Sequence, residues 1–284
     1  MSKNNNLNKA KKEANDEFYT QYEDIAKEIE HYKEHLKGKV VYCNCDIPYF
    51  SNFHKYFLDN FKELELKKLI VTGYVKNGNG KCSIYDGEKS TDYDLLGDGD
   101  FRGDECIDML QKADVVITNP PFSLFRDFIK VVVDNRKDFI VVGSKTSIGY
   151  KDIFELFQGG VISTGYEIPN KFFSSNGELT SIVQGLCRWF TSLPVMKPLL
   201  LMGANYYENN YTKYDNYNAI NIDRVCDIPH NYEHAMGVPI TFMDKHNRSQ
   251  FEIVRFRKGD DGKDLRVDGK DKFQRVLIKR KGVV

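Results

Sequence analysis

Apolar and polar residues follow two alternating patterns along the first half of this chain. Short runs of apolar, mostly β-branched residues are typical of buried strands, and between them apolar residues recur every three or four positions, as on one face of a helix. The expected strands cover residues 39–43, 68–74, 114–118 and 139–143, and the expected helices cover 21–37, 51–61, 105–112 and 123–134. This alternation predicts an α/β fold with a largely parallel, doubly wound, Rossmann-like sheet.

The pattern is interrupted twice. Asn77–Gly80 is a turn signal that predicts a hairpin or a loop excursion, continuing to Gly97–Asp100. Beyond Lys151 the regularity fades, although segments such as 184–191 and 251–257 still have the pattern of strands. We therefore expect a flexible polar arm over 1–14, a Rossmann-like domain over 15–159, and an irregular region with C-terminal strands over 160–284.

Composition excludes several classes of protein. Hydrophobic residues make up 41% of the 284 residues and charged residues 29%, a composition typical of globular proteins. No apolar run approaches the roughly 20 residues that are needed to span a bilayer. The N-terminus has no apolar segment of the kind found in a signal peptide, so we expect a cytoplasmic protein without membrane contact. The six cysteines are scattered; a metal site at Cys43, Cys45 and Cys106 is disfavoured by their spacing, and no metal is expected.

The numbers of positive and negative side chains are equal over the whole chain, but their distribution along the sequence is uneven. Lys and Arg number 41, as do Asp and Glu, so any contact with nucleic acid must come from local patches. The best patch is Phe251–Val284, with eleven Lys and Arg against six Asp and Glu. It could face phosphates, or it could be a solvated hairpin surface.

Asn119-Pro120-Pro121-Phe122, directly after the expected strand 114–118, carries the most specific chemistry. The Asn119 side-chain oxygen and the Pro120 carbonyl can accept the two hydrogens of an exocyclic amine, while Phe122 stacks on the ring that bears it. This arrangement is typical of enzymes that methylate amino groups. The structural alternative is a strand ended by proline and followed by a helix with Ser123 as its N-cap.

Ligands of an open parallel sheet bind beyond the carboxyl ends of its strands, so the turns there are the places to search. Asp46 follows the first strand, and Asp100 and Phe101 follow the glycine-rich excursion. The two acids can bind the hydroxyl and amino donors of a nucleoside, and Phe101 can flank its ring, although an Asp in such a turn more often bonds local backbone. The chain has no Gly-x-Gly-x-x-Gly loop, which favours a small nucleoside cofactor without phosphates.

Several segments together resemble the EcoRI-type adenine-specific DNA methyltransferases of restriction–modification systems, over most of the chain from Asp16 onward. The segments that carry the resemblance are Asp16–Thr20, Cys45–Pro48, Ser51–Phe53, Gly99–Arg102, Asn119–Arg126, Tyr214–Tyr217, Met236–Asp244 and Gln250–Ile253. The resemblance implies a Rossmann-like S-adenosylmethionine-dependent catalytic domain, double-stranded DNA as the substrate and a target-recognition region over 160–284. It also raises a cognate restriction endonuclease as a partner, and we expect a monomer.

By the same resemblance, Phe18, Tyr19 and Thr20 hold the methionine end of the cofactor, and Asp46 and Asp100 hold the adenosine. One departure from the wider methyltransferase pattern is that the first loop is not glycine-rich. Another is that the second strand ends in Thr72-Gly73-Tyr74 without an acid, which leaves open which carboxylate binds the ribose.

The expected reaction is direct transfer of a methyl group to N6 of an adenine flipped out of the duplex. Asn119, Pro120, Pro121 and Phe122 form the expected catalytic motif. Target recognition is expected within 160–236, where the Asn/Tyr-rich tract 205–217 either offers groups to bases or packs as an ordinary polar loop. The alternatives are methylation of an RNA base or a protein glutamine amide, and a catalytically silent DNA-binding decoy.

Overall fold

The chain forms two compact units. The computed structural model describes residues 19–169, 172–173, 179–180 and 185–281. The first unit comprises the described parts of Met1–Ile148 and Gly165–Pro194, and the second comprises Gly149–Thr164 and the described part of Val195–Val284. The expected arm over 1–14 and the site residue Phe18 lie outside the described residues.

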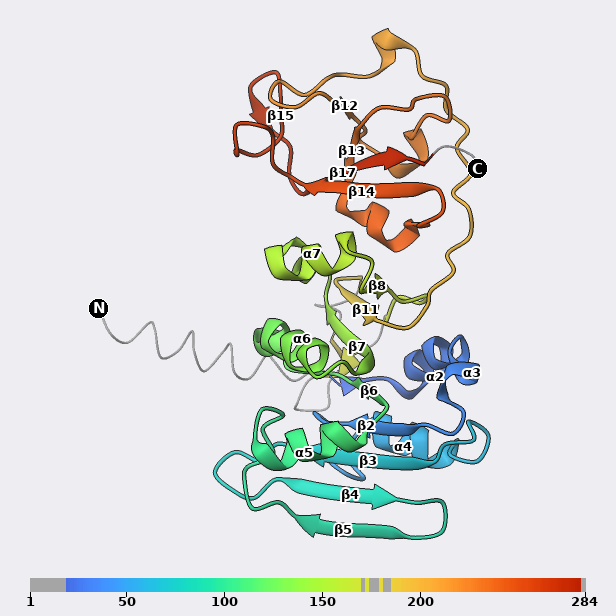
Figure 1. Ribbon diagram of the computed structural model, residues 1–284, viewed down its shortest axis with the longest axis vertical. Helices are drawn as coiled ribbons and strands as arrows, with labels where there is room; N and C mark the ends of the chain where they lie inside the picture. The colour runs from blue at the N-terminus through green and yellow to red at the C-terminus, as the bar shows by residue number, and fades with distance from the viewer. Residues whose placement is uncertain (1–18, 170–171, 174–178, 181–184, 282–284) are drawn as a thin grey trace, which may run out of the picture. The chain divides into compact units, whose positions relative to one another are not determined.

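The first unit is built on a sheet whose strands run in the order β5-β4-β3-β2-β6-β7-β11 (Figure 1). The four inner strands β3, β2, β6 and β7 are parallel, while β4, β5 and β11 pair antiparallel at the two sides. The bounds are β2 (Val40–Cys43), β3 (Lys68–Gly73), β4 (Lys81–Tyr85), β5 (Ser90–Asp94), β6 (Val115–Thr118), β7 (Asp138–Ser144) and β11 (Cys187–Thr191). The expected Rossmann-like α/β sheet is confirmed, and the excursion after β3 is the β4–β5 hairpin.

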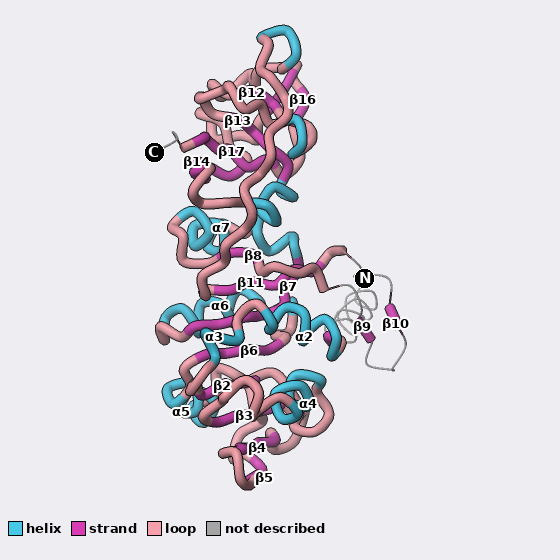
Figure 2. Tube along the Cα trace, turned by 90° about the vertical axis from the view of Figure 1, so that its right-hand side faces the viewer, coloured by secondary structure: helices cyan, strands magenta, loops and turns pink. Residues whose placement is uncertain are grey.

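Helices cover both faces of this sheet (Figure 2). Helices α2 and α4 lie on one side of the strands, and α5 and α6 lie on the other. The bounds are α2 (Tyr22–Glu30), α3 (Lys33–Leu36), α4 (Asn52–Asp59), α5 (Asp104–Lys112), α6 (Phe125–Asp134) and the 3-10 turns η1 (Phe122–Leu124) and η2 (Lys145–Gly149). Because both faces are covered, all residues of β2 and β6 are buried, which explains their unbroken apolar sequences.

Two expectations about helices were wrong in detail. The helix expected over 21–37 is interrupted between α2 and α3, where Tyr32 leaves the helical conformation with φ −117° and ψ 6°. Its apolar face is nevertheless buried as the spacing predicted. Ser123 is not the N-cap of α6, because a 3-10 turn precedes that helix and Leu124 occupies the cap. Ser51, by contrast, does cap α4, since its hydroxyl accepts the Phe53 N–H at 3.0 Å.

A small antiparallel sheet, in the order β1-β9-β10, also belongs to the first unit. Its strands are β1 (Tyr19–Thr20), β9 (Phe172–Phe173) and β10 (Leu179–Thr180). The Thr20 carbonyl accepts a hydrogen bond from the Asn52 amide at 2.9 Å, so β1 is fixed to the start of α4.

The second unit contains a four-stranded sheet in the order β12-β13-β17-β14 and a two-stranded ribbon, β15-β16. Helix α7 packs on β14, where the Phe154 and Phe256 rings lie 4.9 Å apart. The strand bounds are β8 (Ser163–Thr164), β12 (Ile220–Asn221), β13 (Met236–Pro239), β14 (Phe251–Phe256), β15 (Arg266–Val267), β16 (Lys270–Asp271) and β17 (Arg275–Arg280). The helical segments are α7 (Lys151–Gln158), η3 (Glu208–Asn210), η4 (Val225–Asp227) and η5 (Ile240–Lys245). Short elements joined by long connections account for the weak periodicity of this half of the sequence.

Candidate active site

A cavity of about 530 Å³ lies at the carboxyl ends of β2, β3 and β6. The position of the cavity follows from the sheet order. Strand β3, which follows β2 in the chain, is the neighbour of β2 on one side, and β6 is its neighbour on the other side. Such a reversal of strand order is the switch point where open parallel sheets bind their ligands. The volume is within the range of small-molecule sites. The lining residues are Thr20, Asn44, Cys45, Asp46, Ile47, Ser51, Asn52, Phe53, Tyr74, Lys76, Asp98, Gly99, Asp100, Phe101, Arg102, Asn119, Pro121, Ser123 and Leu124.

Asp46 joins the ends of three strands at this cavity. Its carboxylate accepts hydrogen bonds from the Ser51 hydroxyl at 2.5 Å and from the Thr118 hydroxyl at the end of β6. Its backbone N–H donates to the Thr72 carbonyl of β3 at 3.0 Å. Asp46 therefore lines the cavity as expected, but each carboxylate oxygen already holds an internal partner, which the sequence did not indicate.

Burial raises the pKa of Asp46 to about 6, against the lowering effect of the Ser51 and Thr118 hydrogen bonds. Because the folded pKa lies above the ordinary value of 3.8, the folded protein binds more protons than the unfolded chain between about pH 4 and pH 6. We expect the free energy of unfolding to fall as pH rises through this window, by on the order of 3 kcal/mol from this group. Urea unfolding at several pH values measures it.

The matched variant for this prediction is Asp46→Asn, which removes the titration and keeps the shape of the side chain. In this variant the decrease in stability between about pH 4 and pH 6 should become smaller. An unchanged pH profile would show that Asp46 is not the group responsible.

Residues of the Asn-Pro-Pro-Phe motif lie beside Asp46. Asn119 and Pro121 line the cavity, and Asn119 directly follows Thr118 in the chain. Pro120 is buried, and Phe122 is half-buried and begins the turn η1; neither is among the described residues that line the cavity. The motif thus places its amide at the switch point of the sheet.

Asp100 and Phe101 form a second wall of the cavity. The Asp100 carboxylate accepts two hydrogen bonds from the Arg102 guanidinium, at 2.9 and 2.6 Å, and Arg102 holds the pKa of that carboxyl below its usual range. The Phe101 ring is buried and packs edge-on against Phe128, with centroids 5.2 Å apart. Both residues lie where the sequence predicted, but Arg102 as a partner of Asp100 was not foreseen.

Among the other lining residues are Asn44, Asp98 and Tyr74, which follow expected strands or the excursion and were given no role from the sequence. Asn44 is 1% exposed, and within the described residues neither atom of its amide has a hydrogen-bond partner; the same holds for the buried hydroxyl of Thr20, which was expected in the site. Buried polar groups without partners are rare in proteins and are often found where a ligand completes the site. The available signal for Asn44 was its position immediately after a buried strand.

The comparison with protein families shows to which family the chain belongs. The family described as "Adenine-specific methyltransferase EcoRI" matches residues 6–95 and 75–282. The chain belongs to this methyltransferase family. It is 43% identical to "Type II methyltransferase M.EcoRI" of Escherichia coli, over 97% of this chain and 96% of the relative. No solved structure matches this methyltransferase.

Two mycoplasma proteins are similar over nearly their whole lengths. The methyltransferase is 34% identical to "Type II methyltransferase M.MgeORF184P" of Mycoplasma genitalium, over 98% of this chain and 99% of the relative. It is 35% identical to "Type II methyltransferase M.MpnI" of Mycoplasma pneumoniae, over 97% and 98% respectively. The expected family and the expected enzyme class, a methyltransferase, are confirmed.

The cavity of this methyltransferase suits S-adenosylmethionine, the methyl donor that the family implies. The charged residues of its lining are three carboxylates, Asp46, Asp98 and Asp100, and two cations, Lys76 and Arg102, which favours a ligand bearing a positive sulfonium. The unpartnered Asn44 amide and Thr20 hydroxyl offer neutral donors and acceptors to an amino-acid end. The part of the chain that the structure describes contains no group of three or more His, Cys, Asp or Glu able to hold a metal, and no helix long and apolar enough to cross a membrane.

In the second unit of the methyltransferase, acids partner much of the basic tail. Six of its cations form ion pairs with Asp side chains: Arg255, Arg257, Lys258, Arg266, Lys272 and Arg275. Within the described residues Lys279, Arg280 and Lys281, at the end of β17, take part in no ion pair. Lys263 and Lys270 likewise take part in no ion pair among the described residues, but only 279–281 places three such cations consecutively in the chain.

The Asn/Tyr-rich tract 205–217 mostly packs its aromatic rings within the second unit. Tyr206 contacts the rings of Tyr211 and Tyr232, with centroids 5.6 and 4.5 Å away, and Tyr214 is 6% exposed. Tyr207 is 62% exposed. The tract is thus closer to the polar-loop alternative than to an array of free aromatic side chains.

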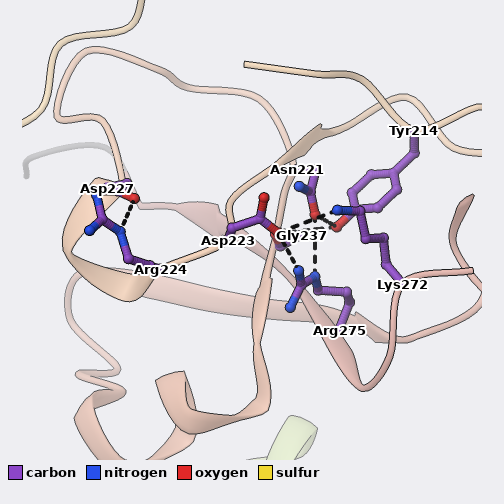
Figure 3. Close-up of polar contacts among 8 residues, drawn as sticks. All are labelled: Tyr214, Asn221, Asp223, Arg224, Asp227, Gly237, Lys272 and Arg275. Carbon is purple, nitrogen blue, oxygen red and sulfur yellow. Dashed lines mark hydrogen bonds and ion pairs between the residues drawn. The ribbon is translucent and has the colours of Figure 1, made fainter. Parts of the chain in front are cut away.

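Tyr214 anchors a polar network at the base of this tract (Figure 3). Its hydroxyl lies 2.9 Å from Asn221 Oδ1 and 3.3 Å from the Gly237 carbonyl, while Arg275 donates to Asn221 at 3.2 Å and to Asp223 at 2.6 Å. The network connects β12, β13 and β17 through side chains from three separate segments and the Gly237 carbonyl.

Tyr214→Phe should destabilise the second unit by about 1–2 kcal/mol, because it removes a buried hydroxyl hydrogen bond; the Asn221 oxygen keeps the Arg275 donor, and the Gly237 carbonyl keeps the Ile222 N–H. Amide hydrogen exchange along β12 and β13 measures this local effect. Tyr207→Phe is the control, because that side chain is mostly exposed. Equal exchange rates in the two variants would contradict the role given to the Tyr214 hydroxyl.

Proposed function

We propose that this protein transfers the methyl group of S-adenosylmethionine to N6 of an adenine in double-stranded DNA. The observation that carries the proposal is the cavity at the switch point of the sheet, where Asn119 and Pro121 share one lining with Asp46, Asp100 and Phe101. Membership of an adenine-specific methyltransferase family supports adenine as the target. The Type II methyltransferases among the relatives support duplex DNA as the substrate and a restriction endonuclease as a companion activity.

On the substrate side, the adenine is flipped out of the duplex and stacks on Phe122. Asn119 Oδ1 and the Pro120 carbonyl accept the two N6 hydrogens, which directs the nitrogen lone pair toward the methyl group. Pro121 keeps the turn rigid, so that this geometry exists before substrate binds. The site thereby orients N6 and stabilises the positive charge that develops on it.

On the cofactor side, Phe18, Tyr19 and Thr20 hold the methionine end. Asp46, Asp100 and Phe101 hold the adenosine. When bound, S-adenosylmethionine supplies a methyl group activated by the sulfonium charge. The Asp100–Arg102 ion pair fixes the loop that carries Phe101, so the Phe101 ring is in position before the cofactor binds.

DNA contact is assigned to the region 160–284, with Lys279, Arg280 and Lys281 facing phosphates. Replacing all three by alanine should lower the slope of log binding constant against log salt concentration by up to about three, because each lost phosphate contact removes about 0.9. Fluorescence anisotropy with a duplex at several salt concentrations measures the slope. Lys258→Ala is the control, since Asp264 already pairs with that cation at 2.6 Å; a slope unchanged in the triple variant would remove this strip from the DNA contact.

Incubation of purified protein with S-adenosylmethionine labelled in its methyl group, and with mixed genomic DNA, tests the proposed reaction. After digestion to nucleosides, we expect the label in N6-methyladenosine. Cofactor binding without label in DNA would reject the DNA reaction and direct the same assay to RNA and to protein glutamine amides. Binding of DNA without any transfer would indicate a silent DNA-binding protein.

A further inference from the structure

Three carboxylates line the cavity, and two of them are already committed to the protein. Asp46 accepts the Ser51 and Thr118 hydroxyls, one on each oxygen. Asp100 accepts the Arg102 guanidinium on both oxygens and the Arg102 N–H on one of them. A ligand that approaches either carboxylate must share it with these donors.

Asp98 is the third carboxylate, and it differs in its surroundings. It is exposed, and its Oδ1 accepts one hydrogen bond, from the Asp100 N–H at 3.0 Å. Among the described residues no donor contacts its Oδ2. Asp98 is therefore a lining residue of the cavity whose carboxylate keeps one oxygen without a described donor.

The backbone of Asp98 is fixed beside the carboxyl end of β3. The Val75 N–H donates to the Asp98 carbonyl at 2.8 Å, and the Gly80 N–H donates to the Gly97 carbonyl at 2.8 Å. Strand β3 itself ends at Gly73 and is followed by Tyr74, so it supplies no acid of its own. The loop after the β4–β5 hairpin thus returns to β3 and places Asp98 beside the carboxyl end of that strand, which has no acidic residue of its own.

We propose that Asp98 binds the ribose of the cofactor by accepting hydrogen bonds from its 2′ and 3′ hydroxyls. The proposal rests on the proposed function, because it assumes that the cavity holds S-adenosylmethionine. Two vicinal hydroxyls are two donors on neighbouring carbons, and a carboxylate with an available oxygen accepts such a pair well. Hydrogen bonds to a charged acceptor are about twice as strong as neutral ones, so this contact contributes substantially to affinity.

The test measures binding with two ligands that differ only at the ribose. Isothermal titration calorimetry is performed with S-adenosylhomocysteine and with its 2′,3′-dideoxy analogue, on the wild-type protein, Asp98→Ala and Asp98→Asn. Asp108→Ala is the control, because it removes an equally charged, exposed side chain on α5 that does not line the cavity. Thermal unfolding of each variant verifies that the first unit remains folded.

We expect Asp98→Ala to weaken S-adenosylhomocysteine binding by about 10- to 100-fold and to leave binding of the dideoxy analogue within about twofold. Asp98→Asn keeps one neutral acceptor and should fall between Asp98→Ala and the wild type. Asp108→Ala should match the wild type for both ligands.

Equal weakening for both ligands would overturn the assignment, because it would mean that Asp98 acts by holding the loop and Asp100 in place. Unchanged binding of S-adenosylhomocysteine in both Asp98 variants would overturn it as well. These outcomes differ from failure of the proposed function, in which the wild-type protein itself binds neither S-adenosylhomocysteine nor S-adenosylmethionine.

Discussion

Asn119→Ala is expected to lower the rate of methyl transfer about a thousandfold or more, while S-adenosylmethionine still binds with an affinity within about threefold of the wild type. The amide oxygen of Asn119 is proposed to accept one N6 hydrogen, so its loss removes the group that orients the amine toward the methyl donor. Binding of the cofactor is proposed to depend on other lining residues of the cavity, Thr20, Asp46 and Asp100. Single-turnover transfer of labelled methyl to DNA, together with calorimetry, separates the two effects.

Asn135→Ala is the matched control for this substitution, since Asn135 caps the far end of α6 and is not among the described residues that line the cavity. It should transfer methyl groups at the wild-type rate. Wild-type turnover in Asn119→Ala would reject the catalytic assignment. A parallel loss of cofactor affinity would instead show that Asn119 supports the cofactor pocket.

The sequence predicted the inner sheet well because those strands are short, apolar and covered on both faces. The short apolar, β-branched runs at 114–118 and 139–143 predicted buried strands, and both are strands in the structure. The position of Ser51 directly before an amphipathic stretch predicted its role as a helix cap. The position of Asn119 followed in turn, since a residue directly after a buried parallel strand lies at the ligand-binding edge of the sheet. These predictions rest on local patterns, which a sequence records directly.

The partners of the site residues could not be predicted in the same way, because they come from distant parts of the chain. Thr118 reaches Asp46 across 72 positions, and no local pattern records that contact. Asp98 follows a hairpin whose return to β3 depends on pairing between strands rather than on its own sequence. The charge count of the C-terminal tail left its role open for the same reason: Asp260, Asp261 and Asp264 pair with four of its eleven cations only once the hairpins fold.

The Asp46 contacts suggest why this site has no need of a glycine-rich first loop. Here the first loop turns its own carboxylate toward Ser51 and Thr118 and so joins β2 to β6. The first loop is thereby held at the switch point by side-chain hydrogen bonds.

Gly99→Ala is expected to destabilise the first unit by about 3 kcal/mol or more and to abolish measurable binding of S-adenosylhomocysteine. Gly99 has φ +85°, and a Cβ atom there would lie 2.4 Å from the Gly73 carbonyl oxygen and 3.1 Å from the Gly80 Cα. All of these neighbours are backbone atoms, so the loop must move away from β3. That movement displaces Asp98, Asp100 and Phe101 together.

Trp189, the only tryptophan of the chain, is buried in the first unit and reports its unfolding by fluorescence in urea. Gly97→Ala is the matched control, because it lies in the same loop and its Cβ would meet only the Glu105 side chain, at 3.7 Å. It should unfold and bind S-adenosylhomocysteine like the wild type. If Gly99→Ala unfolded and bound S-adenosylhomocysteine like the wild type, close packing of this loop on β3 would not be required to position Asp98 and Asp100 in the cavity.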